Sequence, residues 1–125
     1  MKKRIKELRD GLTIELIEQQ FPWLLKAKFK DAIIGVENGL IVWYEGIWKD
    51  GVWENGIWKD GDWIKGTWLN GTWLKGIWKN GIWHNGVWKD GTWKNGIFKN
   101  GIWHYGYWMD GEFEDGEFID EWEPH

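Results

Sequence analysis

The chain has 125 residues, a formal net charge of −4, and 42 % hydrophobic and 18 % aromatic residues, which suits one domain with ample material for a core. The absence of cysteine excludes disulfides, thiolate nucleophiles and cysteine-ligated metal sites. No run of about 18 apolar residues occurs, and the basic start at residues 1–4 leads into no apolar stretch, so we expect neither a membrane span nor a secretory signal, and a location in the cytoplasm or in a particle assembled there.

Residues 1–40 are predicted to form an N-terminal cap that begins with helical structure. The highly charged segment 2–9 predicts a short helical turn. Thr13 is a suitable N-cap for a second helix that runs to about Phe21, and Pro22 ends that helix.

The cap is predicted to finish with the start of a β-hairpin that leads into the rest of the chain. Residues 27–34 read as a strand, residues 37–39 carry the turn-forming pair Asn-Gly, and residues 40–44 read as a second strand. Repeat proteins need such caps because their end units would otherwise expose core or strand edges.

A five-residue repeat array fills residues 41–120 in sixteen consecutive units of the form Gly-x-Trp-x-Asp/Asn. Tryptophan holds the third position in thirteen units, and Phe98, Phe113 and Phe118 hold it in the other three. The thirteen tryptophans are Trp43, Trp48, Trp53, Trp58, Trp63, Trp68, Trp73, Trp78, Trp83, Trp88, Trp93, Trp103 and Trp108. A pattern this regular predicts a repeat architecture in which one structural unit is copied.

Each position of the unit has its own chemistry. Glycine is first in fifteen units, the second residue is mostly β-branched, and Asp or Asn stands before eleven of the fifteen glycines. β-branched residues favour strands, and Asp-Gly or Asn-Gly steps supply backbone that tolerates the positive φ of tight turns. The unit therefore predicts a three-residue extended piece followed by a corner.

Two all-β folds can be built from this unit. One is an antiparallel β-meander with a hairpin at every corner, and residues 44–51 resemble the start of a MORN repeat, although the longer remainder of that repeat is missing. The alternation of backbone hydrogen-bonding directions along a strand argues against the meander. With three strand residues between two-residue turns, the residue that leaves one turn and the residue that enters the next point toward the same neighbouring strand, whereas a meander needs them to point toward opposite neighbours. We therefore favour a parallel β-solenoid and keep the MORN-like meander as the alternative.

The period of the array resembles that of the pentapeptide-repeat family, whose chains form right-handed square β-helices. In that family a Leu or Phe at the centre of each unit faces inward with a small residue two places before it, and here Trp and Gly take those places. The family's usual Ala-Asp/Asn-Leu order is absent. The resemblance implies a four-sided solenoid of about four 20-residue coils, in which every Trp and its preceding Gly face inward. Matches between residues 66–85 and 86–105 also favour 20 residues, although an offset of one unit scores nearly as well.

The chain ends in a strongly acidic segment. Residues 109–125 carry eight acidic side chains and no Lys or Arg, and the final acidic tail, residues 121–125, includes Trp122, which no longer follows the five-residue spacing. This end could be a solvated terminus that protects a strand edge, or an electrostatic contact for a basic partner.

The sequence offers no constellation typical of an enzyme. On 20-residue coils His84 would stack on His104, but two histidines fall short of the three or four ligands of a zinc site. Lys59, Lys79 and Lys99 would form a ladder that we expect to be solvated rather than bound to phosphate. We therefore predict no catalytic, cofactor-binding or metal-binding residues, no cofactor and no enzymatic activity.

As a whole, residues 27–120 resemble Trp-rich Gly-x-Trp-x-x pentapeptide-repeat proteins of tailed phages. The resemblance implies a non-enzymatic structural or protein-binding repeat protein, such as a virion or tail component. One alternative is an inhibitor that mimics DNA, as some pentapeptide-repeat proteins do when they bind topoisomerases, and another is a carbohydrate-binding module with exposed Trp. The even lysine content of residues 46–108 argues against a mimic. We expect a protein partner, no nucleic acid and no membrane, and leave a homo-oligomer open.

Overall fold

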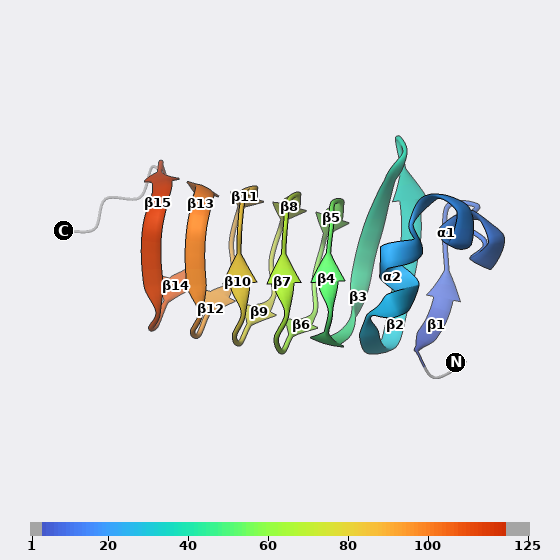
Figure 1. Cartoon of the computed structure of the whole chain (residues 1–125), viewed down its shortest axis with the longest axis horizontal. Coiled ribbons are helices and arrows are strands. Elements are labelled where there is room, and N and C mark those ends of the chain that lie inside the picture. Colours follow the sequence, from blue (N-terminus) through green and yellow to red (C-terminus); the bar gives the residue numbers. More distant parts are fainter. Residues whose placement is uncertain (1–3, 120–125) are drawn as a thin grey trace.

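The computed structural model describes residues 4–119 and shows an elongated parallel β-solenoid of about five coils, with two short helices at its N-terminal end (Figure 1). This confirms the predicted all-β solenoid with a small helical cap. The antiparallel meander is wrong for the array, because the strands of successive coils pair in parallel. The predicted tail at 121–125 lies outside the described residues.

The cap begins with strand β1 (Ile5–Leu8), so the helical turn predicted for residues 2–9 is wrong. This segment pairs in parallel with strand β2 (Lys28–Glu37), and Ile5 and Leu8 pack against the core. Pairing with a neighbouring strand overrides the weak local preference of a charged segment for a helix.

The helix predicted after Thr13 is confirmed as α1 (Ile14–Gln20), and the Leu16 N–H donates to Oγ1 of Thr13 at 3.1 Å. Proline does follow the end of this helix, but it also opens α2 (Pro22–Lys26) at the first position, where its missing N–H costs nothing. α2 lies against the first coil, where Trp23 meets Trp53, and α1 packs against α2.

The predicted hairpin is confirmed and is longer than expected. Strand β2 pairs antiparallel with β3 (Leu40–Asp50) across a turn in which Asn38 and Gly39 have φ of 54° and 78°. β3 continues past the predicted end at residue 44 and forms the first corner of the solenoid, so the hairpin and the array share one strand.

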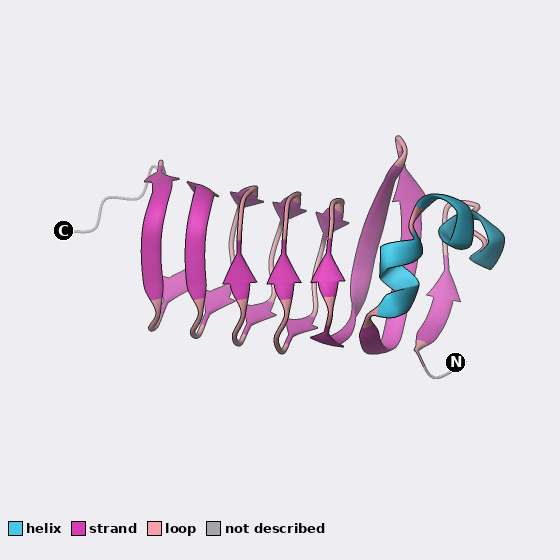
Figure 2. Cartoon of the chain, viewed as in Figure 1, coloured by secondary structure: helices cyan, strands magenta, loops and turns pink. Residues whose placement is uncertain are grey.

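The array consists mostly of two-residue strands separated by short corners (Figure 2). These strands are β4 (Val52–Trp53), β5 (Ile57–Trp58), β6 (Asp62–Trp63), β7 (Thr67–Trp68), β8 (Thr72–Trp73), β9 (Ile77–Trp78), β10 (Ile82–Trp83), β11 (Val87–Trp88), β12 (Thr92–Trp93), β13 (Ile97–Trp103), β14 (Tyr107–Trp108) and β15 (Glu112–Phe118). Three faces result. The first face holds β6, β9, β12 and β14, the second β4, β7, β10 and the start of β13, and the third β5, β8, β11 and the end of β13.

Each coil has three sides and 15 residues, so the predicted four-sided coil of 20 residues is wrong. Trp58 pairs with Trp73, and Trp73 pairs with Trp88, which places residues 15 apart in register. Since the units are nearly identical, any multiple of five residues satisfies the sequence pattern. The number of sides is therefore set by how the side chains pack in the interior.

Ring packing explains the three sides. Indoles 15 residues apart stack with centroids 4.6–5.0 Å apart. Because rings in contact are about 3.5 Å apart and coils about 4.8 Å apart, each ring plane must tilt by about 40°. Planes tilted in this way meet at about 70° around a threefold axis and about 55° around a fourfold axis. Successive rings from Trp53 to Trp103 meet at 69–75°, as three sides require.

The glycines form the corners. Gly46 to Gly111 all have φ between 112° and 138°, whereas no Asp or Asn that precedes a corner glycine has a positive φ. A Cβ on Gly76 would collide with the carbonyl oxygen of Gly61 in the coil before. The glycine therefore makes room chiefly for the backbone of its own column. The Asp or Asn acts through its side chain, as when Asp60 Oδ1 accepts from the Gly61 N–H at 2.8 Å.

Two backbone hydrogen bonds join each side of a coil to the coil before. The Ile77 N–H donates to the Gly61 oxygen at 3.0 Å, and the Lys79 N–H donates to the Trp63 oxygen at 2.7 Å. The indole of Trp63 also donates to the Asn80 oxygen at 3.1 Å. The indoles of Trp68, Trp78 and Trp88 donate to the next coil in the same way, so at these positions side chains join the coils as well as the backbone.

The cap closes the N-terminal end of the aromatic core. Trp23 of α2 meets Trp53 edge-on at 5.3 Å, and Phe29 of β2 stacks on Trp48 at 6.2 Å. The Tyr44 hydroxyl donates to Asp10 Oδ2 at 2.8 Å, and this bond is the main reason that the pKa of Tyr44 is raised.

The corner glycines can be tested with a matched pair of substitutions. Gly76→Ala should destabilise the chain by about 3 kcal/mol or more, since it adds a backbone collision to an unfavourable φ. Gly39→Ala should cost only about 1–2 kcal/mol, because its φ is also positive but nothing lies within 4 Å of the added Cβ. Urea unfolding followed by tryptophan fluorescence measures both, and equal costs would contradict the collision.

The Tyr44 bond predicts a pH-dependent contribution to stability. A folded-state pKa above the ordinary 10.0 means that the bond stabilises the fold below pH 10 and is lost as the pH rises through the raised pKa. Tyr44→Phe should therefore lower the urea midpoint at pH 8, and the gap from the parent chain should close in strongly alkaline solution. Tyr107→Phe, at a residue 76 % exposed, is the control and should change little at either pH.

Candidate functional site

The 15-residue coil separates the residues that the sequence had grouped. His84 follows β10 on the second face and His104 follows β13 on the third, so the predicted histidine stack is wrong. Lys59, Lys79 and Lys99 fall on three different faces, so the predicted lysine ladder is also wrong. In residues 4–119 no group of three or more His, Asp or Glu side chains is placed to hold a metal ion.

The sides of the array carry mixed charge. Lys65 lies one coil beyond Asp50, with Nζ 3.8 Å from Oδ2, and Lys75 lies one coil beyond Asp60 at the same distance. These pairs are exposed and add little to stability. They show, however, that a lysine one coil beyond a carboxylate in the same column can reach it.

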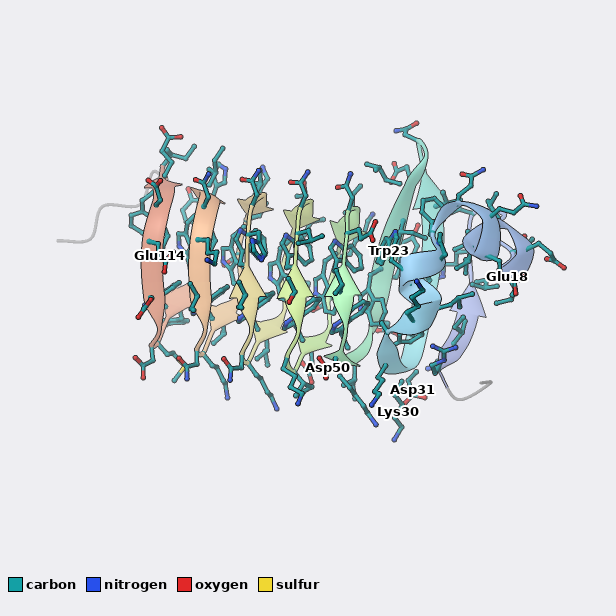
Figure 3. All side chains as sticks on the ribbon, viewed as in Figure 1. Glu18, Trp23, Lys30, Asp31, Asp50 and Glu114 are labelled. Carbon is teal, nitrogen blue, oxygen red and sulfur yellow. The ribbon has the colours of Figure 1, made fainter. Side chains whose placement is uncertain are left out.

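A hollow of about 280 Å³ lies where the cap meets the first two coils. Its lining includes Asp31, Glu45, Asp60 and Asp62, together with Lys6. Figure 3 shows Asp31 on the lower edge of the cap. These carboxylates come from separate corners and strands, so the hollow is a polar crevice rather than a ligand cage.

The C-terminal end of the solenoid exposes the aromatic core. Twelve core tryptophans, from Trp43 to Trp103, are at most 1 % exposed, whereas Phe113 is 39 % and Phe118 is 57 % exposed. Trp103, Trp108, Phe113 and Phe118 line a hollow of about 270 Å³ whose walls are entirely aromatic. We call these four residues the open aromatic end. Within residues 4–119 no cap element covers it (Figure 1).

The last coil also presents unpaired strand edges. In the part of the chain that the structure describes, β14 pairs only with β12, and β15 pairs only with β13. An exposed edge with free N–H and C=O groups is a template for pairing with another chain. The open aromatic end therefore combines uncovered apolar side chains with uncovered backbone.

Carboxylates surround the open aromatic end. Along β15 the side chains alternate, so that Phe113 faces inward between the exposed Glu112 and Glu114. Figure 3 shows Glu114 on this terminal strand. The acidic rim consists of Asp110, Glu112, Glu114, Asp115 and Glu117, all exposed. Among residues 4–119 no lysine or arginine forms an ion pair with any of them.

A second hollow adjoins the open aromatic end through Phe118. It has a volume of about 570 Å³, and its aromatic walls include Tyr105 and Tyr107. Tyr107 is 76 % and Met109 is 63 % exposed. Large apolar side chains thus gather on the outer corner of the last coils as well as on its end.

Sequence reasoning placed Phe113 and Phe118 in the core and treated only the charge of this end as a candidate contact. The signal that could have revealed the exposed surface is a change at the outward positions. Upstream units most often carry Val, Ile or Thr at the second position, Lys at the fourth and Asp or Asn at the fifth, whereas Tyr107, Met109 and Tyr105 occupy these positions in the last units.

Comparisons of the chain with protein-family models, with curated proteins and with solved structures find no match. The arguments about function therefore rest on the geometry of the chain itself. The longest helix in residues 4–119 has seven residues, and none is long and apolar enough to cross a membrane.

The separation of the histidines predicts that zinc does not stabilise the chain. With His84 and His104 on different faces, only single surface ligands are available, and stable zinc sites need three or four. Equimolar zinc should leave the melting temperature unchanged in the parent chain and in a His84→Ala/His104→Ala variant alike. A zinc-dependent rise that the variant loses would contradict the three-sided placement.

Proposed function

We propose that the chain is a non-enzymatic structural or protein-binding repeat protein, in which the solenoid is a rigid spacer and its C-terminal end is the attachment point for another protein. The observation that supports this most is the asymmetry of the two ends. The N-terminal end is covered by α2 and β2, whereas the open aromatic end leaves Phe118 57 % exposed.

The interior supports the spacer role. Three columns of stacked rings run along the solenoid, and each indole also meets its neighbours within the coil edge-on. Interiors packed this closely resist deformation. A rod of this kind holds its two ends at a fixed distance and rotation.

The resemblance to Gly-x-Trp repeat proteins of tailed phages favours a virion or tail component within this proposal. A DNA-mimicking inhibitor of topoisomerases is less well supported, since lysines lie beside Asp50 and Asp60 on the sides of the array. A carbohydrate-binding module would need exposed indoles, and those of the array from Trp43 to Trp93 are buried. We therefore keep the structural or protein-binding role as the proposal.

Photo-crosslinking tests the attachment point. Benzoylphenylalanine placed at Tyr107, beside the open aromatic end, should crosslink the chain to one protein in the cells or particles that contain it. The same group at Lys79, on the side of the array, is the matched control and should give no such product. Recovery of the product from purified particles would support a virion component.

Two results would contradict the proposal. One is equal crosslinking from Tyr107 and Lys79, which would place the contact on the sides. The other is inhibition of DNA gyrase in a supercoiling assay by the purified chain, which would favour the DNA mimic.

A further inference from the structure

We propose that the open aromatic end binds a protein segment that adds one more β-layer to the solenoid, with apolar side chains facing inward and lysine or arginine side chains facing outward. This inference rests on the proposed protein-binding function and specifies the chemistry of the partner. It follows from the rings, the strand edges and the charges of the last coil.

Among residues 4–119 the last rings lack the second stacking partner that the central rings have. Trp78 stacks on Trp63 at 4.8 Å and on Trp93 at 4.7 Å, one on each side. Trp108, in contrast, stacks in residues 4–119 only on Trp93, at 5.0 Å. Within the same described residues Phe113 stacks only on Phe98. One apolar side chain above each column would complete the packing, so the partner has to supply apolar groups at that spacing.

The free edges define the backbone of the partner. β14 and β15 each have one strand neighbour in the described chain, and the ladder of the array continues by adding parallel strands. An extended segment that pairs with such an edge directs alternate side chains to opposite faces. Its inward residues then meet the rings while its outward residues lie above the acidic rim.

The acidic rim defines the outward side chains of the partner. An added layer places its outward residues about 4.8 Å above Glu112, Glu114 and Glu117. The array already shows the favourable arrangement, since Lys65 and Lys75 each lie one coil beyond an aspartate at 3.8 Å. Acidic residues at these positions would be repelled, so the rim selects a basic partner.

A second copy of the chain does not meet these requirements. Two open aromatic ends placed face to face would bring two acidic rims together, and like charges at an interface oppose association. In a head-to-tail arrangement the open end would meet the cap. Among residues 4–119 every large hydrophobic side chain that is exposed lies at Val52 or beyond, so the cap offers the rings only partly buried apolar side chains, such as Trp23.

Two synthetic peptides test the proposal, one alternating leucine with lysine and the other alternating leucine with glutamate. The lysine peptide should bind the full chain, with a Kd lower by at least about tenfold than the glutamate peptide. Fluorescence anisotropy gives the Kd, and NMR shifts at the amides of Phe113 and Phe118 locate the site. Added salt should weaken the binding of the lysine peptide, because the rim charges are exposed and salt screens them.

Variants separate the charge and apolar contributions. The triple variant Glu112→Gln/Glu114→Gln/Glu117→Gln should raise the Kd of the lysine peptide by about tenfold. The matched control, Glu15→Gln/Glu18→Gln/Glu54→Gln, makes the same change in charge far from the end and should have less than about a twofold effect. Phe118→Ser should weaken the binding of both peptides. The array should remain folded in this variant, because Phe118 is 57 % exposed on the last described strand.

Three results would overturn the inference. The first is equal binding of both peptides, and the second is an equal loss of affinity for the lysine peptide in the rim and control variants. The third is self-association of the chain, seen in sedimentation experiments, that Phe118→Ser abolishes. Equal peptide binding together with a specific crosslink at Tyr107 would reject the basic partner while the proposed function stands. A discriminating peptide site without any crosslink would reject the proposed function instead.

Discussion

The structure depends on a mismatch between two distances. Hydrogen-bonded coils lie about 4.8 Å apart, whereas aromatic rings in contact are about 3.5 Å apart. A column of stacked rings can satisfy both distances only if every ring tilts, and the tilt brings the edge of each ring against the face of the next. Edge-to-face contact is itself favourable for aromatic rings. The observed angles of about 70°, such as 70° between Trp68 and Trp73, match three sides, so the ring geometry also sets the 15-residue coil.

The corners follow from the same constraint. Closing a coil with three sides requires a turn of about 120° at each corner, sharper than in a four-sided coil, and glycine reaches the φ values that permit it. The columns of glycine also let the backbone of one coil approach that of the next, as at Gly61 and Gly76. The Asp or Asn before each glycine contributes in a different way, by accepting the glycine N–H. The repeated unit thus encodes a side, a corner and a ladder contact in five residues.

The sequence was sufficient to predict the parts that one unit determines by itself. The inward tryptophans, the parallel solenoid and the helix that begins at Thr13 follow from spacing, parity and capping. The coil length could not be predicted in the same way, because identical units give the same pattern at every multiple of five. The assignments of His84 and His104 failed with it. Strand β1 was missed because its partner, β2, lies more than twenty residues away, and the exposure of Phe118 was missed because nothing in its own unit distinguishes it from the buried units before it.

A triangular rod with three units per coil ties chain length to orientation. Inserting or deleting three units, or 15 residues, changes the length of the rod by one coil and leaves the acidic rim facing the same direction relative to the cap. A change of one unit, by contrast, rotates everything beyond it by a third of a turn, although every local contact is preserved. Duplication of single units, which the sequence pattern would tolerate freely, therefore alters the angle between the cap and the open aromatic end. The number of units therefore sets the angle between the two ends of the rod as well as the distance between them.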